Sequence, residues 1–156
     1  MNSLLNIGLD AGSTTLKVVV TDSNHHVIYK KYRRHYANIA GTLHEILQEL
    51  IGIIGDQPAK LCITGSAGMG IAQRFKLPFV QEVIACATAV KKFIPLTDTA
   101  VELGGEDAKI TYFGAAPEQR MNGVCAGGTG AFIDHMASLL DTDAAGLNAL
   151  AAKGTR

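Results

Sequence analysis

Three short apolar segments, each followed by small and polar residues, open the chain. They cover residues 4–9, 16–21 and 27–32, and aspartate, glycine and asparagine residues separate them. Short runs rich in β-branched residues with such turns between them are typical of consecutive strands. The pattern therefore predicts a three-strand meander joined by tight turns.

A helical repeat follows the meander. Apolar residues recur every three or four positions, at Ile39, Leu43, Ile46, Leu47, Leu50, Ile51 and Ile54. This spacing predicts an amphipathic helix over residues 39–54. Further helices are expected over residues 69–75, 82–93, 127–140 and 143–152, and further strands over residues 60–64, 99–103 and 109–113.

The order of these elements favours an α/β fold. Three strands followed by an alternation of helices and strands predict a mixed sheet that contains the meander and has flanking helices packed on it. Asp141 or Thr142 is expected to cap the last helix. Residues 151–156 end that helix without a closing strand, so we expect the chain to be part of a longer protein.

Composition and charge limit the classes of partner. Lys+Arg and Asp+Glu both number 14, and this balance gives no reason to expect a nucleic-acid or membrane partner. A basic run over residues 30–35 is interpreted as the solvated end of a strand. The first residues contain no positively charged leader, and no apolar stretch reaches the roughly 18 residues of a membrane span. The three cysteines are widely spaced in the sequence. We therefore expect a cytoplasmic protein with reduced thiols.

Residues 8–17, with the sequence GLDAGSTTLK, carry the first candidate site. A predicted strand delivers Asp10 into a turn where Gly12 lets backbone N–H groups approach an anion, and Ser13 and Thr14 add hydroxyl donors. A carboxylate beside a phosphate makes chemical sense if hydrated Mg²⁺ lies between them. The same residues are also compatible with an Asp/Gly hairpin turn that binds no ligand.

Residues 101–110, VELGGEDAKI, repeat the pattern of strand, acid, glycines and strand. A tight turn with exposed acids is the alternative interpretation. If the two acid–glycine turns follow adjacent strands, they would hold a phosphate–metal unit from two sides while a carboxylate aligns the attacking water. A Walker A site is excluded, because no Gly-x-x-x-x-Gly-Lys-Ser/Thr motif occurs.

A third segment, NGVCAGGTG at residues 122–130, places a cysteine just before a predicted helix. A helix N-terminus favours thiolate, so Cys125 could be a metal ligand, a nucleophile or a structural residue, and the residues alone favour the last. A single cysteine cannot hold an iron–sulfur cluster, which normally takes about four. The glycine-rich run at residues 127–130 is a further candidate anion site.

Together and in this order, the three segments resemble the actin-like ATPase superfamily. Residues 10–14 resemble its first phosphate loop and residues 102–107 its second. Residues 122–130 are similar to the cluster-ligand loop of one branch, the BadF/BadG/BcrA/BcrD ATPase family, which contains activators of 2-hydroxyacyl-CoA dehydratases and benzoyl-CoA reductases. The resemblance extends over almost the whole chain and implies a ribonuclease H-like (actin-like ATPase) domain.

The resemblance also implies an activity. ATP and Mg²⁺ would drive a low-potential electron from a homodimer into a dehydratase or reductase partner. One [4Fe-4S] cluster would lie at the subunit interface, with Cys125 as one ligand and a second cysteine of each subunit beyond Arg156. Residues 1–156 are expected to be the N-terminal, phosphate-binding half of the fold, without the adenosine-binding half. Residues 32–35 and 104–133 are similar to large fused activators, so we expect an N-terminal fragment of such a protein.

Site residues follow from the motifs and the resemblance together. The candidate catalytic residues are Asp10, Glu102 and Asp107, with Asp10 holding Mg²⁺ through water. The candidate phosphate-binding residues are Gly12, Ser13, Thr14, Lys17, Gly104, Gly105, Gly127, Gly128 and Thr129. Glu102 departs from the family pattern, in which many relatives have aspartate, and its extra methylene would move the carboxylate by about a bond length.

Two other functions remain open at this point. A small-molecule kinase of the amino-sugar type could use the same fold, but it would leave Cys125 without a role. A regulatory or assembly module would keep the fold without turnover. Cys86 lies in an apolar helical segment and is expected to be a core residue.

Overall fold

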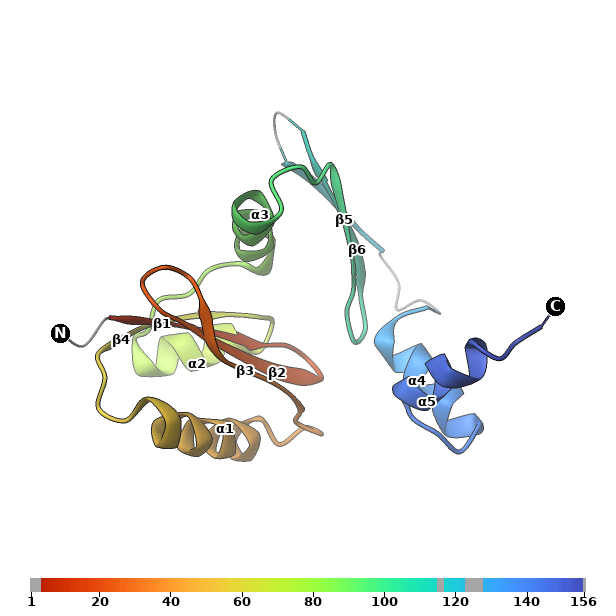
Figure 1. Cartoon of the computed structure of the whole chain (residues 1–156), viewed down its shortest axis with the longest axis horizontal. Coiled ribbons are helices and arrows are strands. Elements are labelled where there is room, and N and C mark those ends of the chain that lie inside the picture. The colour runs from red at the N-terminus through yellow and green to blue at the C-terminus, as the bar shows by residue number, and fades with distance from the viewer. Residues whose placement is uncertain (1–3, 115–116, 123–127, 156) are drawn as a thin grey trace. The chain divides into compact units, whose positions relative to one another are not determined.

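The computed structural model describes residues 4–114, 117–122 and 128–155. The chain divides into two compact units, Met1–Ala89 and Val90–Arg156, and each has a sheet of its own (Figure 1). The helix α3 (Glu82–Phe93) runs across the boundary between them.

The first unit is a mixed sheet with helices. Its elements are β1 (Leu5–Ala11), β2 (Thr15–Thr21), β3 (Val27–Arg34), α1 (Ile39–Ile54), β4 (Ala59–Thr64) and α2 (Gly68–Phe75). The strand order is β3-β2-β1-β4, in which β1, β2 and β3 form an antiparallel meander and β4 pairs with β1 in parallel. The predicted meander and mixed sheet are confirmed.

One face of this sheet carries the hydrophobic core. Successive side chains of a strand point to opposite faces, and on β2 the alternate residues Leu16, Val18 and Val20 are at most 1% exposed. Ile46 of α1 joins them in one cluster. Burial of a side chain of this size contributes about 1.5–3 kcal/mol. The core therefore holds α1 to one face and leaves the polar residues of β1 and β2 on the other.

The edge strand β3 is fastened to α1 by ion pairs. Lys31 Nζ lies 2.7 Å from Glu49 Oε2, and the Arg33 guanidinium donates to Glu45 Oε2 at 2.6 Å and to Glu49 Oε1 at 2.7 Å. The Tyr29 hydroxyl also donates to Glu49, at 3.2 Å. The interpretation of this basic run as the solvated end of a strand is wrong for Lys31 and Arg33, whose side chains face the acids of α1.

A close backbone approach joins the ends of β4 and β1. Gly65 adopts a φ of +97°, and a Cβ at this position would collide with the backbone of Ala11. The N–H of Ala67 donates to the same Ala11 carbonyl oxygen at 2.8 Å. Only glycine fits such a position. The turn after β4 is thereby fixed against the residue that follows Asp10.

The second unit is an antiparallel sheet with two helices after it. Its elements are β5 (Thr99–Leu103), β6 (Ala108–Phe113), β7 (Pro117–Met121), α4 (Gly130–Leu139) and α5 (Ala144–Ala151), and the strand order is β5-β6-β7. The sequence did not predict β7. Its residues, PEQRM, are mostly exposed, so pairing with β6 rather than an apolar face defines this edge strand.

The cap of α5 differs from the prediction. Asp143, not Asp141 or Thr142, caps this helix, since its Oδ1 accepts from the N–H of Gly146 at 2.8 Å. Asp141 has a φ of 49°, and the N–H of Thr142 donates to Ala137 O. Both residues therefore terminate α4 instead.

The placement of the two acid–glycine turns also differs. β1 pairs with β2 and β4, whereas β5 pairs with β6 in the sheet of the other unit. The turns therefore do not follow hydrogen-bonded neighbours, and their joint hold on one phosphate–metal unit stays a prediction. The core position expected for Cys86 is wrong. This cysteine is half-buried, and α3 has no fully buried residue along its described length.

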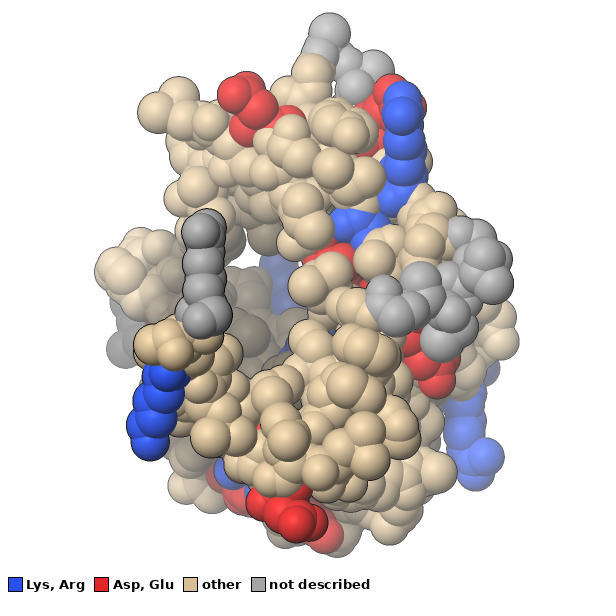
Figure 2. Space-filling model, turned by 90° about the vertical axis from the view of Figure 1, so that its right-hand side faces the viewer, with Lys and Arg blue, Asp and Glu red and all other residues tan. Residues whose placement is uncertain are grey.

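Within the described ranges, no helix combines the length and the apolar character needed to cross a bilayer. On the face drawn in Figure 2, lysines and arginines lie among acidic side chains, and uncharged residues cover most of the surface. This mixture agrees with the equal numbers of basic and acidic residues in the sequence.

We predict opposite effects for two glycine substitutions. Gly65→Ala should lower the free energy of unfolding by at least about 2 kcal/mol, because it adds both a left-handed alanine and a backbone overlap. Gly52→Ala is the matched control, since a Cβ there meets nothing within 4 Å, and it should raise stability by about 0.5–1 kcal/mol. Urea unfolding of both variants measures the difference. Equal effects would contradict the close approach at Gly65.

We also predict a pH-dependent contribution from Glu49. The hydrogen bond from Lys31, and with it that from Arg33, holds the pKa of Glu49 below its ordinary value of 4.5, against an opposing effect of desolvation. A depressed pKa in the folded state stabilises above the unfolded value and is lost as the pH falls below it. The stability difference between the wild type and Glu49→Gln should therefore be present at pH 6 and shrink below about pH 4.5. Thermal unfolding against pH, with Asp56→Asn as an exposed control, measures this; a constant difference would contradict it.

Candidate functional site

The first acid–glycine turn is the hairpin between β1 and β2. Its turn closes through the N–H of Gly12, which donates to Thr15 O at 2.9 Å. Asp10 and Lys17 are cross-strand partners, and Lys17 Nζ lies 2.7 Å from Asp10 Oδ2. The lysine therefore fixes the orientation of the carboxylate.

The other oxygen of this carboxylate is buried without a partner. Asp10 Oδ1 and Thr64 Oγ1 are both shielded from solvent and form no hydrogen bond among the described residues. The two residues are register partners on β1 and β4, so their side chains stand on the same face of the sheet. A buried unpaired acceptor costs about 1–3 kcal/mol. Hydrated Mg²⁺ fits such a position, because water bound to the metal donates to carboxylate and hydroxyl oxygens.

These residues belong to a polar row that crosses the whole sheet. Thr64, Asp10, Lys17 and Tyr32 are consecutive register partners on β4, β1, β2 and β3. The Lys17 ammonium also lies 5.9 Å from the centre of the Tyr32 ring, within cation–π range. Lys17 is thus held between an acid and an aromatic ring, on the face opposite the core.

A buried histidine ties the hairpin to the turn between β3 and α1. His35 is only 4% exposed. Its Nε2 lies 3.1 Å from Gly12 O, and the N–H of Ala37 donates to its Nδ1 at 3.2 Å. These partners assign the proton to Nε2, which donates to the carbonyl, and leave Nδ1 as the acceptor. The backbone N–H of His35 adds a bond to Thr14 O at 3.2 Å.

The turn held by His35 is strained. Tyr36 and Ala37 both adopt positive φ, 45° and 64°, and a non-glycine residue in this region costs of order 1–3 kcal/mol. Two such residues in succession persist only where the surroundings impose them, and here His35 and the helix cap Asn38 do so.

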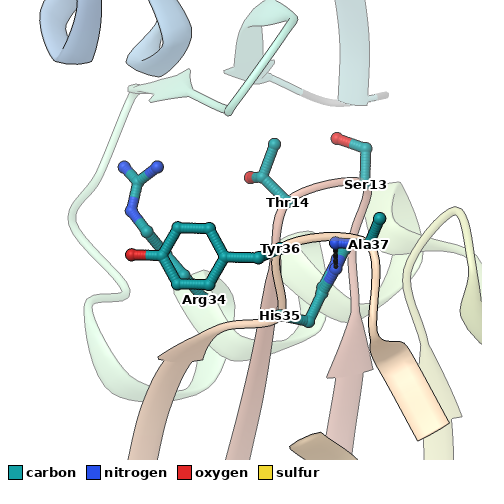
Figure 3. Close-up of a pocket in the computed structure, with 6 residues that line it drawn as sticks. All are labelled: Ser13, Thr14, Arg34, His35, Tyr36 and Ala37. Atoms are coloured by element: carbon teal, nitrogen blue, oxygen red, sulfur yellow. Dashed lines mark hydrogen bonds between the residues drawn. The ribbon is translucent and has the colours of Figure 1, made fainter.

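A pocket of about 140 Å³ lies between the hairpin and this turn. Its lining residues are Ser13, Thr14, Arg34, His35, Tyr36 and Ala37. Figure 3 shows the side chains of Ser13 and Thr14 at the tip of the hairpin, and those of Arg34 and Tyr36 from the end of β3. The candidate residues Ser13 and Thr14 therefore line a concave surface together with residues from the end of β3 and the turn after it.

The second acid–glycine turn repeats the geometry of the first. The N–H of Gly104 donates to Asp107 O at 2.7 Å, as Gly12 donates to Thr15 O. Glu102 and Lys109 are cross-strand partners, as are Asp10 and Lys17, but Glu102 Oε1 lies 3.9 Å from Lys109 Nζ. The Glu102 side chain is 47% exposed against 28% for Asp10. The longer acid is therefore less tightly held.

The second turn is bonded to the start of α4. The N–H groups of Gly130 and Ala131 donate to the carbonyl oxygens of Gly104 and Gly105, both at 2.8 Å. These two donors are consequently engaged by protein, and an anion at residues 127–130 would need other groups. Thr129 is 1% exposed.

Part of the predicted site lies outside the described residues. Cys125 and Gly127 are the two predicted residues concerned. Gly128 is described, and its φ is +103°. Elsewhere in the described ranges, no group of three or more His, Cys, Asp or Glu side chains could hold a metal ion by itself. A metal at Asp10 would therefore complete its coordination with water and phosphate oxygens.

The structure groups the candidates into two sets. Asp10, Lys17 and the hydroxyls Ser13 and Thr14 belong to the first unit, and Glu102, the two glycines, Asp107 and Thr129 belong to the second. Sequence reasoning missed Thr64, Arg34 and His35. His35 could have been noticed in the sequence because it ends the basic run. No sequence pattern marked Thr64, because only the register of β4 places it beside Asp10.

Comparison with known proteins identifies relatives. The 2-hydroxyisocaproyl-CoA dehydratase activator of Clostridioides difficile is 29% identical over 92% of this chain and 55% of its own length. The (R)-2-hydroxyglutaryl-CoA dehydratase activating ATPase of Acidaminococcus fermentans is 27% identical over 99% of this chain and 60% of its own length. The chain thus spans less than two thirds of these relatives.

Solved structures share the fold. Component A of the (R)-2-hydroxyglutaryl-CoA dehydratase of Acidaminococcus fermentans aligns with a TM-score of 0.85, at 24% identity, over 99% of this chain and 61% of that one. The activator of the 2-hydroxyisocaproyl-CoA dehydratase from Clostridium difficile, solved with bound ADPNP, aligns with a TM-score of 0.82, at 26% identity, over 97% and 58%. The predicted α/β fold of the actin-like ATPase activators is therefore confirmed.

The family model that matches this sequence covers residues 7–156, which is nearly its whole length and includes both acid–glycine turns. On that match, the chain belongs to the BadF/BadG/BcrA/BcrD ATPase family.

Proposed function

We propose that this chain is the phosphate-binding half of an ATP-hydrolysing activator for a 2-hydroxyacyl-CoA dehydratase. Family membership and relatives that are named as dehydratase activators support the class of activity. A related activator was solved with an ATP analogue, which supports ATP as the nucleotide. The adenosine-binding half would be supplied by sequence outside residues 1–156.

The buried oxygen of Asp10 is the observation that carries this proposal. Lys17 satisfies Oδ2, and Oδ1 stays unpaired on the polar face beside the glycine turn. A hairpin turn that served only the fold would be expected to pair or expose both oxygens of its acid. A carboxylate held in this way suits the water shell of Mg²⁺, with phosphate on its far side.

The residues of this hairpin would have different roles in ATP hydrolysis. Bound Mg²⁺ supplies positive charge that offsets the negative charge of the phosphoryl group. Asp10 would orient the metal's water ligands, while Ser13 and Thr14 donate to phosphate oxygens. Lys17 would hold the carboxylate in place. Such positioning and charge stabilisation account for most of the catalysis in phosphoryl transfer.

The second hairpin would supply the water-aligning acid. Glu102 and Asp107 flank Gly104, whose turn matches that of Gly12. Gly104 and Gly105 also bond to the start of α4. Movement of this turn during hydrolysis would therefore be transmitted to the start of α4.

Electron transfer forms the finer part of the proposal. Cys125 would give one ligand to a [4Fe-4S] cluster shared by two subunits of a cytoplasmic homodimer, and the electron would pass to a dehydratase. A benzoyl-CoA reductase is the alternative partner. Support comes from the sequence NGVCAGGTG and from the family match through this segment.

Asp10→Asn tests the catalytic assignment in the intact protein. The loss of the charge should reduce Mg²⁺-dependent ATP hydrolysis by about a hundredfold or more and weaken Mg²⁺–nucleotide binding measured by calorimetry. The control is Asp56→Asn in the exposed turn after α1, which should retain wild-type rates. Unchanged hydrolysis and affinity in a folded Asp10→Asn protein would overturn the assignment.

Cys125→Ser tests the cluster assignment. After anaerobic reconstitution of the intact protein with iron and sulfide, the wild type should gain visible absorption and an electron paramagnetic resonance signal on reduction, and the variant should lose both, because serine is a poor ligand for the cluster. ATP hydrolysis should persist. Cys62→Ser on β4 is the matched control and should retain the cluster. A cluster of equal content in Cys125→Ser would contradict the assignment.

A further inference from the structure

The tip of the first hairpin carries two consecutive backbone N–H groups that the fold does not use. Gly12 closes the turn with its own N–H, which donates to Thr15 O at 2.9 Å. Between them, the N–H groups of Ser13 and Thr14 form no hydrogen bond among the residues that the structure describes. Ser13 is exposed and Thr14 is half-buried, so the tip borders solvent. Successive backbone N–H groups of this kind suit an anion.

His35 holds two carbonyl oxygens of the same tip. Its Nε2 donates to Gly12 O at 3.1 Å, and its backbone N–H donates to Thr14 O at 3.2 Å. The C=O and the N–H of a planar trans peptide unit point in opposite directions. Because the Gly12 carbonyl is directed at His35, the N–H of Ser13 in the same peptide unit is directed away from it. The histidine therefore determines which way this N–H points.

The imidazole ring is itself held on its other side. Its Nδ1 accepts from the N–H of Ala37 at 3.2 Å, the bond drawn as a dashed line in Figure 3, and His35 is only 4% exposed. The positive φ of Tyr36 and Ala37 is of a kind that surrounding contacts impose and that is concentrated at functional sites. A buried ring with both nitrogens engaged gives the hairpin tip a rigid support. A loop that is fixed before binding loses less entropy when a ligand arrives.

We propose that His35 is a positioning residue of the phosphate loop. It holds the Gly12–Ser13 peptide with the N–H of Ser13 turned outward, so that this N–H and that of Thr14 donate to the phosphates of the nucleotide. His35 does not touch the nucleotide in this role and acts only through the hairpin backbone. The assignment rests on the proposed function, since it takes a nucleotide as the source of the phosphate.

Two substitutions separate this role from simple support of the turn at Tyr36 and Ala37. His35→Gln places an amide nitrogen near the position of Nε2, where it can still donate to Gly12 O. His35→Asn places an oxygen near the position of Nδ1, where it accepts from the N–H two residues on, as in an Asx turn, and it is too short to reach Gly12. Both variants keep the backbone bond to Thr14 O.

Calorimetric titration of the intact protein with ADPNP and with pyrophosphate, in the presence of Mg²⁺, tests the assignment. His35→Asn should weaken the binding of both probes by about tenfold, which corresponds to the loss of one hydrogen bond. His35→Gln should stay within about threefold of the wild type. The control Asn38→Ala removes the side-chain cap of α1, so it should lower the thermal unfolding temperature and leave the affinity unchanged.

Nitrogen-15 chemical shifts of the His35 ring give a measurement that needs no variant. In the wild type bound to Mg²⁺ and ADPNP, they should show a protonated Nε2 and an unprotonated Nδ1. The opposite tautomer would remove the donor to Gly12 O and overturn the assignment, even if His35→Asn does not fold.

The calorimetric results can overturn the assignment in three ways. Equal ADPNP affinity in folded His35→Asn and the wild type would show that the bond to Gly12 does not matter for binding. An equal loss in Asn38→Ala would trace the effect to lower stability, and a larger loss in His35→Gln than in His35→Asn would assign the ring to the turn alone. If the wild type binds neither probe, the proposed function fails as well, whereas tight binding by both the wild type and His35→Asn removes only the positioning role.

Discussion

Asp10 ends β1 with one carboxylate oxygen 2.7 Å from Lys17 and the other buried without a partner. A carboxylate in this state is costly for a ligand-free protein, and neighbouring features maintain it. The core on the opposite face fixes β1 and β2. The backbone contact of Gly65 with Ala11 fixes β4, and with it Thr64, beside Asp10. The fold of the first unit thus keeps a polar position under-satisfied, and such positions are where ligands bind.

The position of β3 at the edge of the sheet explains why this strand is so basic. An edge strand needs charged side chains to resist pairing with other molecules, and those of β3 alternate between two tasks. Lys31 and Arg33 bind the acids of α1, while Tyr32 contacts Lys17 on the site face. One strand therefore fastens α1 to the core side and completes the polar row on the other.

Local patterns predicted most of the fold. The spacing of apolar residues predicted the bounds of α1, an Ala- and Val-rich segment before Pro95 predicted α3, and the meander followed from turn residues between short apolar runs. β7 was missed because its five residues carry no apolar alternation, and strand identity there depends on the partner strand. The division into two sheets was missed for a related reason. Strand pairing between distant segments is decided by tertiary packing, and the spacing of apolar residues along the chain carries no information on it.

Site residues divide in the same way. Asp10, Gly12 and Glu102 were accessible from sequence, because an acid followed by glycine at a strand end has a recognisable chemistry. Thr64 and Arg34 were not, since each is placed by cross-strand register and neither stands in a glycine-rich motif. His35 lay in a run of residues that was interpreted only by its positive charge. In the structure, the two ring nitrogens of His35 instead form hydrogen bonds with backbone groups.

The two hairpins are alike in backbone and different in how firmly they hold their acids. Both close a turn through a glycine N–H, and both set an acid opposite a lysine. Asp10 is short, 28% exposed and in contact with its lysine at 2.7 Å, so it has little rotational freedom left to lose on binding. Glu102 is longer, 47% exposed and 3.9 Å from its lysine. In the proposed function, the fixed acid would position the metal, and the looser acid could adjust to a substrate water, because its ion pair is weak enough to break. A glutamate would therefore serve the second turn in a way that it would not serve the first.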